Sequence, residues 1–207
     1  MPLTLKHVTL TVAGNTLIKD LNLEVFPGSV LALMGSSGCG KSSLLSYIAG
    51  TISQAFKCRG EVWLGHTKIS TLPIHKRHVG IQFQDHLLFP HMTVGENLAF
   101  GIPSGYGRKE RKRRVMHALG SCDMANFSHH DPATLSGGQK ARISLMRTLL
   151  SEPKALLLDE PFSKLDPNLK KSFREFVIQQ ITSRAVPTIM VTHDADDTLN
   201  ANQVIQL

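Results

Sequence analysis

The sequence has few cysteines, no long apolar segment and no internal repeats. Its three cysteines are an odd number at irregular spacing, which argues against a disulfide framework and favours a reducing compartment. No stretch approaches the ~18 consecutive apolar residues that a membrane span requires. Residues 1–14 alternate polar and apolar side chains and lack the apolar centre of a signal peptide. We therefore expect a soluble protein whose contact with any membrane passes through a partner.

Composition and charge are those of an ordinary globular protein. The 207 residues suffice for one well-packed domain, and charged residues make up 19% of them. The formal net charge of +7 would suit a nucleic acid or an anionic membrane face. However, the only dense basic run, residues 108–114, opens a predicted helix, and such runs are usually solvated surface. We expect no nucleic-acid partner.

Residues 35–42 read Gly-Ser-Ser-Gly-Cys-Gly-Lys-Ser, a complete phosphate-binding loop. The apolar run Val30–Met34 before it is typical of a strand buried on both faces. After it, residues 42–49 are predicted to form a helix that Gly50 closes. The backbone N–H groups of such a loop point into one concavity at the positive end of the helix, which is a site for an anion.

The residue types inside this loop have separate tasks. Gly35, Gly38 and Gly40 allow a tight turn without a clash of Cβ atoms. Lys41 is placed to reach the β- and γ-phosphates of a nucleotide, and the Ser42 hydroxyl is placed to bind Mg²⁺. The alternative, a plain glycine turn between a strand and a helix, leaves the eight-residue match unexplained.

Short apolar runs and capping patterns predict the remaining elements. Residues 93–96 and 136–139 each have the capping-box pattern that opens a helix, and residues 102–134 read as helical with Gly and Pro breaks. The predicted strands, with a turn at Gly14-Asn15, are residues 3–11, 21–26, 30–34, 61–64, 79–83, 155–159, 188–192 and 204–207. The predicted fold class is α/β, with a mostly parallel sheet, an N-terminal antiparallel β subdomain and a helical subdomain inserted at about residues 93–150.

Two acidic residues, Asp159 and Glu160, end the apolar run that starts at Ala155. A carboxylate at the end of a buried strand can reach a metal, and Mg²⁺ binds one or two carboxylates together with phosphate oxygens and water. Glu160 is then the natural general base for an attacking water. Phosphoryl transfer requires mainly positioning and neutralisation of charge, and these residues supply both.

The phosphate-binding loop, the pentapeptide Leu135-Ser136-Gly137-Gly138-Gln139 and the Asp159-Glu160 pair occur in an order that resembles the ATPase subunit of ABC transporters. The resemblance covers residues 3–207. It implies a single domain with a P-loop NTPase core that binds ATP and Mg²⁺ and hydrolyses ATP. The residues that the resemblance assigns to ATP in the loop are Gly35, Ser36, Ser37, Gly38, Cys39, Gly40, Lys41, Ser42 and Ser43.

Further positions match the family pattern one at a time. Gln84 matches the glutamine that contacts Mg²⁺ and the attacking water, with Gln82 as a nearby rival. His193 matches the histidine that touches the γ-phosphate. The predicted catalytic set is therefore Lys41, Gln84, Glu160 and His193, and the predicted metal ligands are Ser42, Gln84 and Asp159. Residues 163–166 match the loop that crosses the dimer interface of the family.

The resemblance also implies partners. In the family two subunits pack head to tail, and Ser136, Gly137, Gly138 and Gln139 of one subunit meet the γ-phosphate held by the other. We therefore expect an ATP-dependent homodimer, peripheral on the cytoplasmic side of the inner membrane and bound to integral permease subunits. Residues 83–94 resemble the importer branch, which serves a periplasmic binding protein, and residues 60–64 and 131–135 resemble one bacterial subgroup of it. An exporter ATPase subunit and a non-transport ABC ATPase remain alternatives, and the cargo stays open.

The chain departs from the family pattern at two places. The family usually stacks an aromatic near position 12 on adenine, whereas the matching residue here is Val12, and no aromatic precedes Phe26. How the base is held stays open. The chain also ends soon after His193, so we expect no C-terminal regulatory domain.

The segment Leu87–Met92 is too apolar for an idle surface loop. Two interpretations remain open. The segment packs into the core, or it borders a groove that receives a short helix of the membrane subunit.

Overall fold

The computed structural model describes residues 1–207, except for the side chain of Asn168. The chain forms two compact units. The first comprises residues 1–81, 154–160 and 178–207, and the second comprises residues 82–153 and 161–177.

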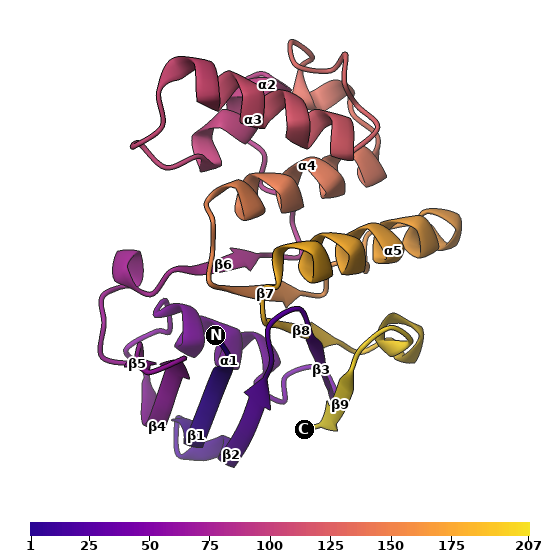
Figure 1. Cartoon of the computed structure of the whole chain (residues 1–207). Helices are drawn as coiled ribbons and strands as arrows, with labels where there is room; N and C mark the ends of the chain where they lie inside the picture. The colour runs from indigo at the N-terminus through magenta and orange to yellow at the C-terminus, as the bar shows by residue number, and fades with distance from the viewer. The chain divides into compact units, whose positions relative to one another are not determined.

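Two sheets build the first unit (Figure 1). The antiparallel sheet has the order β2-β1-β4-β5, with β1 Leu3–Val12, β2 Asn15–Val25, β4 Phe56–Leu64 and β5 Thr67–Lys68. The other sheet has the order β6-β7-β8-β3-β9, with β3 Val30–Met34, β6 Val79–Gln82, β7 Ala155–Asp159, β8 Thr188–Thr192 and β9 Gln203–Gln206. Strand β8 pairs in parallel with β7 and with β3, and β3 pairs in parallel with β9. The predicted α/β class is confirmed.

One hydrophobic core joins both sheets of the first unit to helix α1 (Lys41–Ala49). Strands β7 and β8 are buried along almost their whole length, because apolar elements cover both faces of a parallel sheet. Full burial of one leucine or isoleucine side chain contributes ~1.5–3 kcal/mol to folding. The core therefore fixes the strands whose ends carry the phosphate-binding loop and the acidic pair.

Helix α1 ends where the sequence predicts. Gly50 has a left-handed backbone with φ of +89° and donates its N–H to Ser46 O and Tyr47 O. Buried Arg77, in the turn after the short 3₁₀ helix η1 (Ile74–Lys76), adds hydrogen bonds to Tyr47 O and Ile48 O. A side chain at Gly50 would lie 2.7 Å from this guanidinium, so the position requires glycine.

The second unit consists mainly of helices, namely α2 (Val94–Gly101), α3 (Arg108–Ser121), the 3₁₀ helix η2 (Pro132–Thr134) and α4 (Gly137–Leu150). Both predicted capping boxes are confirmed. Thr93 accepts from Glu96 N and Glu96 accepts from Thr93 N, and Ser136 and Gln139 make the same reciprocal pair at the start of α4.

Three sequence-based expectations for the elements were incomplete. Strands β2 and β4 begin at Asn15 and Phe56, earlier than predicted, because register shifts in β1 disturb the alternation of side chains. Residues 122–131 are turns and not helix, and Asp123 there has φ of +60°. Helix α5 (Pro167–Arg184) was missed, although Asp166 before Pro167 is the pattern of an N-cap followed by a first-turn proline.

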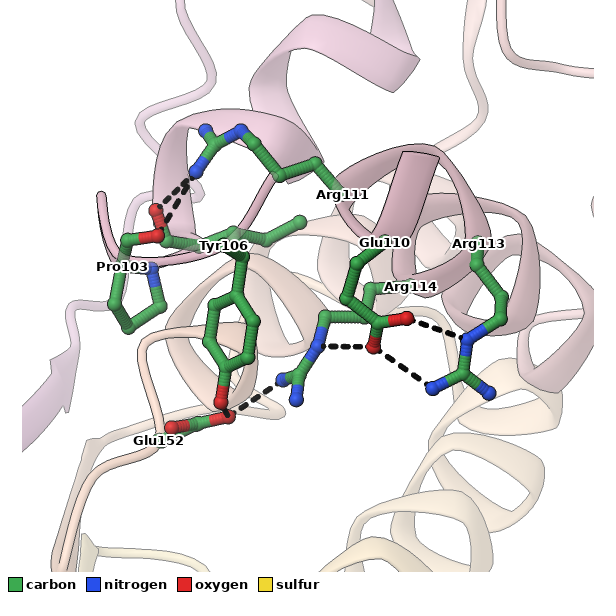
Figure 2. Close-up of polar contacts among 8 residues, drawn as sticks. Pro103, Tyr106, Glu110, Arg111, Arg113, Arg114 and Glu152 are labelled. Atoms are coloured by element: carbon green, nitrogen blue, oxygen red, sulfur yellow. Dashed lines mark hydrogen bonds and ion pairs between the residues drawn. The ribbon is translucent and has the colours of Figure 1, made fainter. Parts of the chain in front are cut away.

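Two arginines of the basic run at the start of α3 contact other parts of the second unit (Figure 2). Arg111 donates to the carbonyls of Ala99, Ile102 and Pro103, at the end of α2. Arg114 lies over the Tyr106 ring at 3.7 Å and donates to Glu152, to which the Tyr106 hydroxyl also donates. The expectation of a solvated face holds for Arg108, Lys109, Lys112 and Arg113, which are exposed, whereas Arg111 and Arg114 tie α3 to its surroundings.

Glu110 accepts hydrogen bonds from both Arg113 and Arg114, and these bonds lower the pKa of its carboxyl to about 2 (Figure 2). A group whose pKa is lower in the folded state stabilises the fold above its unfolded pKa. This contribution is lost as the pH falls from about 4.5 through 2.

We predict that Glu110→Gln melts below the unmodified protein at pH 7, and that the difference in melting temperature shrinks as the pH falls toward 3. Thermal unfolding followed by circular dichroism across this range measures the effect. Glu24→Gln, at an exposed position of β2, is the matched control and should melt like the unmodified protein. A difference that is constant with pH would contradict the assignment.

Candidate functional site

The phosphate-binding loop connects β3 to α1, as predicted. Gly38 and Gly40 have φ of +83° and +100°, which side-chain-bearing residues rarely adopt. A Cβ at Gly35 would lie 2.7 Å from Cys39 Sγ, and one at Gly40 would lie 3.0 Å from Leu17 Cβ. All three glycines therefore have a structural requirement, two for backbone conformation and Gly35 for close approach.

Lys41 is the cationic centre of this loop. The side chain is buried, and Nζ donates to Gly35 O at 2.7 Å and to Ser36 O at 2.9 Å. The N-cap of α1 is Gly40, which supplies no side-chain acceptor, and the first turn has no acidic residue. A buried ammonium group and uncapped N–H groups at a helix start together favour an anion. Ser36, Ser37 and Gly38 are exposed at the mouth of the loop.

Ser42 and Asp159 meet although they are far apart in the sequence. The Ser42 hydroxyl donates to Asp159 Oδ1 at 3.0 Å. Burial raises the pKa of Asp159, and the charge of Glu160 acts in the same direction, against the opposing effects of Ser42 and Lys41. A divalent cation would offset the cost of burying this carboxylate.

This hydroxyl and carboxylate fit Mg²⁺, which takes one or two protein oxygens and completes its shell with phosphate and water. Within the described part of the chain, no group of three His, Cys, Asp or Glu side chains could hold a metal by itself. The donor set is thus that of a cation which binds together with a phosphate-bearing ligand.

Glu160 and His193 form the second contact of the site. His193 Nδ1 lies 3.0 Å from Glu160 Oε1, and the histidine side chain is 61% exposed. Glu160 has φ of +45°, a left-handed backbone that is strained for a residue with a side chain. Its N–H donates to Val191 O at 3.0 Å, so the sheet holds this conformation. Such strain is typical of functional sites.

Gln84, its rival Gln82 and the pentapeptide that ends at Gln139 belong to the second unit. Gln84 is exposed, and Nε2 donates to Ser163 Oγ at 3.2 Å. Its rival Gln82 is only 2% exposed, and neither side-chain polar atom has a hydrogen-bond partner among the described residues. Lys164 forms an ion pair with Asp85. Two links therefore join the segment around Gln84 to residues 163–166 within this unit.

The pentapeptide that ends at Gln139 forms the start of α4. Ser136 and Gly137 are exposed, whereas Gly138 is buried and a Cβ there would lie 3.3 Å from Leu169 Cδ1. A hollow of about 220 Å³ is lined in part by Ser136, Gly138 and Gln139. The helix start thus presents a hydroxyl and backbone N–H groups to the outside, as a site for an anion requires.

Val12, the expected base contact, is half-buried at the end of β1. It pairs with Asn15 on one side and with Phe56 of β4 on the other. Sequence reasoning could not place Phe56 there, because strand register is not visible in the spacing of residues. The close approach of Leu17 to Gly40 brings this end of β2 next to the phosphate-binding loop.

Comparison with known proteins extends these observations. A family model described as ABC transporter matches residues 18–163. The chain is 43% identical over 205 residues to the uncharacterized ABC transporter ATP-binding protein YnjD of Escherichia coli (strain K12), covering 99% of this chain and 94% of that protein.

Two further relatives have assigned cargoes. The chain is 36% identical to the Fe(3+) ions import ATP-binding protein FbpC of Mannheimia succiniciproducens. This similarity covers 93% of this chain and 54% of that protein. For the sulfate/thiosulfate import ATP-binding protein CysA of Gloeobacter violaceus the identity is 39%, over 91% of this chain and 54% of that protein. The chain thus spans about half the length of these two relatives. No helix in the described residues is both long and apolar enough to cross a membrane. The chain belongs to the ABC transporter family, among its ATP-binding proteins.

Proposed function

We propose that this chain is the ATP-hydrolysing subunit of a membrane transporter that imports its cargo. One observation carries the proposal. The phosphate-binding loop, the Ser42–Asp159 contact and the Glu160–His193 contact occur together in one unit. Import is favoured because relatives with assigned cargoes are named import ATP-binding proteins.

The loop residues bind the phosphates. Backbone N–H groups of residues 35–43 surround the β- and γ-phosphate oxygens, and the Lys41 ammonium neutralises charge on them. Ser42 and Asp159 would hold Mg²⁺, with Gln84 as a further ligand. Mg²⁺ supplies charge neutralisation to the phosphate oxygens in phosphoryl transfer.

Glu160 acts as the general base. Its carboxylate accepts a proton from a water molecule as the water oxygen attacks the γ-phosphorus, and the bond from that phosphorus to the bridging oxygen breaks, so that ADP leaves with the electron pair. His193 holds the Glu160 carboxylate from one side at 3.0 Å and is available to touch the γ-phosphate. By the family pattern, Gln84 orients the attacking water.

Two copies of the chain form a head-to-tail dimer around ATP. The exposed start of α4, with Ser136, Gly137 and Gln139, faces the γ-phosphate bound to the other copy. The physical basis is again a helix start that faces an anion. ATP then acts as part of the interface, and its hydrolysis releases the dimer.

We predict that Glu160→Gln binds ATP with Mg²⁺ but hydrolyses it at least about 10²-fold more slowly, the scale expected for loss of a general base. Phosphate release measures the rate, and size-exclusion chromatography with ATP should show the variant as a stable dimer. Glu175→Gln, on α5 and remote from these contacts in sequence, is the control. Near-normal turnover in Glu160→Gln would reject the assignment.

The base of the nucleotide packs at the end of β1, against Val12. Phe56 is the cross-strand neighbour of Val12 and is half-buried, so part of its surface is open. Directly paired residues on a sheet have Cβ atoms about 5 Å apart, which brings an aromatic ring to the place that Val12 leaves without one.

We predict that Phe56→Ala weakens ATP binding about five- to a hundredfold, since base stacking on an aromatic ring contributes ~1–3 kcal/mol. Adding Val12→Tyr to this variant should restore affinity. Titration with a fluorescent ATP analogue measures both. Unchanged affinity in Phe56→Ala would mean that the base is held without this ring, and ATP and GTP should then bind alike.

The permease subunits bind to the second unit, at the segment Leu87–Met92 and the helices that follow it. Buried Asn97 fixes the backbone of this segment through hydrogen bonds with Phe89 and Met92. Leu87 remains 58% exposed, and Phe100, whose ring lies 4.7 Å from that of Phe89, is 62% exposed. Part of the segment therefore packs inward, as the interpretation of core packing expected, and part of it is exposed to solvent.

Helices α2 and α3 line a cavity of about 640 Å³ beside these apolar groups. Its lining combines apolar Ala99, Val115 and Met116 with the basic side chain of Lys112 and with His129. The best occupant is a short permease helix that presents apolar side chains and a carboxylate. The complex sits on the cytoplasmic side of the inner membrane and receives cargo from a periplasmic binding protein.

We predict that Leu87→Glu and Phe100→Glu each abolish co-purification with the permease subunits and transport, while the isolated chain keeps its melting temperature and basal ATP hydrolysis. Both residues are exposed, so the fold tolerates the charge. Ile74→Glu, at a residue of the first unit that is 57% exposed, is the control and should assemble normally. Normal assembly of both variants would show that the permease subunits bind to a different surface.

A further inference from the structure

His193 lies on a turn whose neighbouring residues are fixed by buried hydrogen bonds. Strand β8 ends at Thr192, and the 3₁₀ helix η3 (Ala195–Thr198) begins three residues later. The His193 side chain is exposed, so packing alone does not restrict its direction. Its contact with Glu160 therefore depends on how firmly the backbone on either side is fixed.

Thr192 and Asp197 provide this fixation. Both are buried, with 1% and 3% of their surface exposed. Thr192 Oγ1 donates to Asp197 Oδ2 at 2.9 Å. Thr192 Oγ1 also accepts a hydrogen bond from Asp194 N at 3.1 Å. Asp197 N in turn donates to Asp194 O at 3.2 Å. The three bonds form a closed ring around the turn, and His193 is the residue between two of its members.

The hydrogen bond from Thr192 to Asp197 is stronger than one between neutral groups, because its acceptor is a carboxylate. A buried carboxylate is costly unless hydrogen bonds stabilise it, and a bond to a charged acceptor is about twice as strong as one between neutral groups. The Thr192 hydroxyl both donates and accepts, so its loss breaks two bonds at once. None of these atoms belongs to the proposed catalytic set, yet they fix the peptide on both sides of His193.

We propose that Thr192 and Asp197 are positioning residues that hold His193 against Glu160, and that turnover depends on them through His193 alone. The proposal rests on the proposed function, because it needs Glu160 and His193 to act in hydrolysis. Both side chains are buried, so neither is placed to contact the nucleotide. Their loss should therefore lower kcat and leave the affinity for ATP unchanged.

The first test compares Thr192→Val and Asp197→Asn with a matched control. Thr192→Val keeps the shape of the side chain and removes the hydroxyl, and Asp197→Asn removes the charge. We expect kcat to fall about ten- to a hundredfold in each, the scale of a misplaced catalytic group, with the Kd of ATP within about twofold of the unmodified value. Thr198→Val removes a hydroxyl that bonds only locally, to Ala195 O at 2.7 Å, and should keep its kcat.

The second test separates positioning from a merely structural role. In a His193→Ala background, Thr192→Val should cause no further loss of kcat, because its effect passes through the side chain already removed. Equal fold losses of kcat with and without His193 would overturn the proposal. A raised Kd for ATP with unchanged kcat would overturn it as well.

Thr192→Ser covers the case in which the larger changes prevent folding. It keeps the hydroxyl and loses one methyl group, so it should retain most of the turnover and melt close to the unmodified protein. A kcat for Thr192→Ser as low as that expected for Thr192→Val would assign the effect to packing and overturn the proposal. Hydrolysis by the unmodified protein is measured alongside, since its absence would count against the proposed function and not against this ring.

Discussion

The rest of the site depends on the backbone between β3 and α1. Gly38 and Gly40 adopt left-handed conformations there, and Gly35 lies so close to Cys39 that no side chain fits. This compact path lets Lys41, the first residue of α1, fold back onto the carbonyls of its own loop. A buried ammonium group, open backbone N–H groups and a helix start then act on the same small volume, which concentrates positive potential where a phosphate binds.

The parallel sheet brings the other site residues of the first unit to this loop. The carboxyl ends of parallel strands meet at one edge, and β7, β8 and β3 are neighbours in the sheet. Asp159 at the end of β7 therefore meets Ser42, which follows β3 by way of the loop. His193 after β8 meets Glu160 after β7 for the same reason. Pairs of residues 117 and 33 positions apart in the sequence are thus brought within reach of one another's side chains.

Local patterns were enough to predict the loop, its flanking strand and helix, the closure at Gly50 and both capping boxes, because each depends on contacts within a few residues. Long-range features could not be predicted in this way. The pairing of Phe56 with Val12 and the Thr192–Asp197 bond depend on strand register and on a turn after β8. The basic run of α3 was predicted as solvated because its acceptors, such as Glu152 and the carbonyl of Ala99, lie elsewhere in the chain.

Two catalytic candidates, exposed His193 and half-buried Glu160, are oriented in the same way. Glu160 and His193 each follow the last residue of a buried strand, and neither relies on being enclosed. Glu160 keeps a strained backbone because its N–H bonds to Val191, and the turn that carries His193 keeps its shape because Thr192 bonds to Asp194 and Asp197. Hydrogen bonds at the ends of the strands thus set the direction of both residues, while the His193 side chain stays exposed to solvent. A site that admits water and still fixes the direction of its polar side chains requires this separation of orientation from burial.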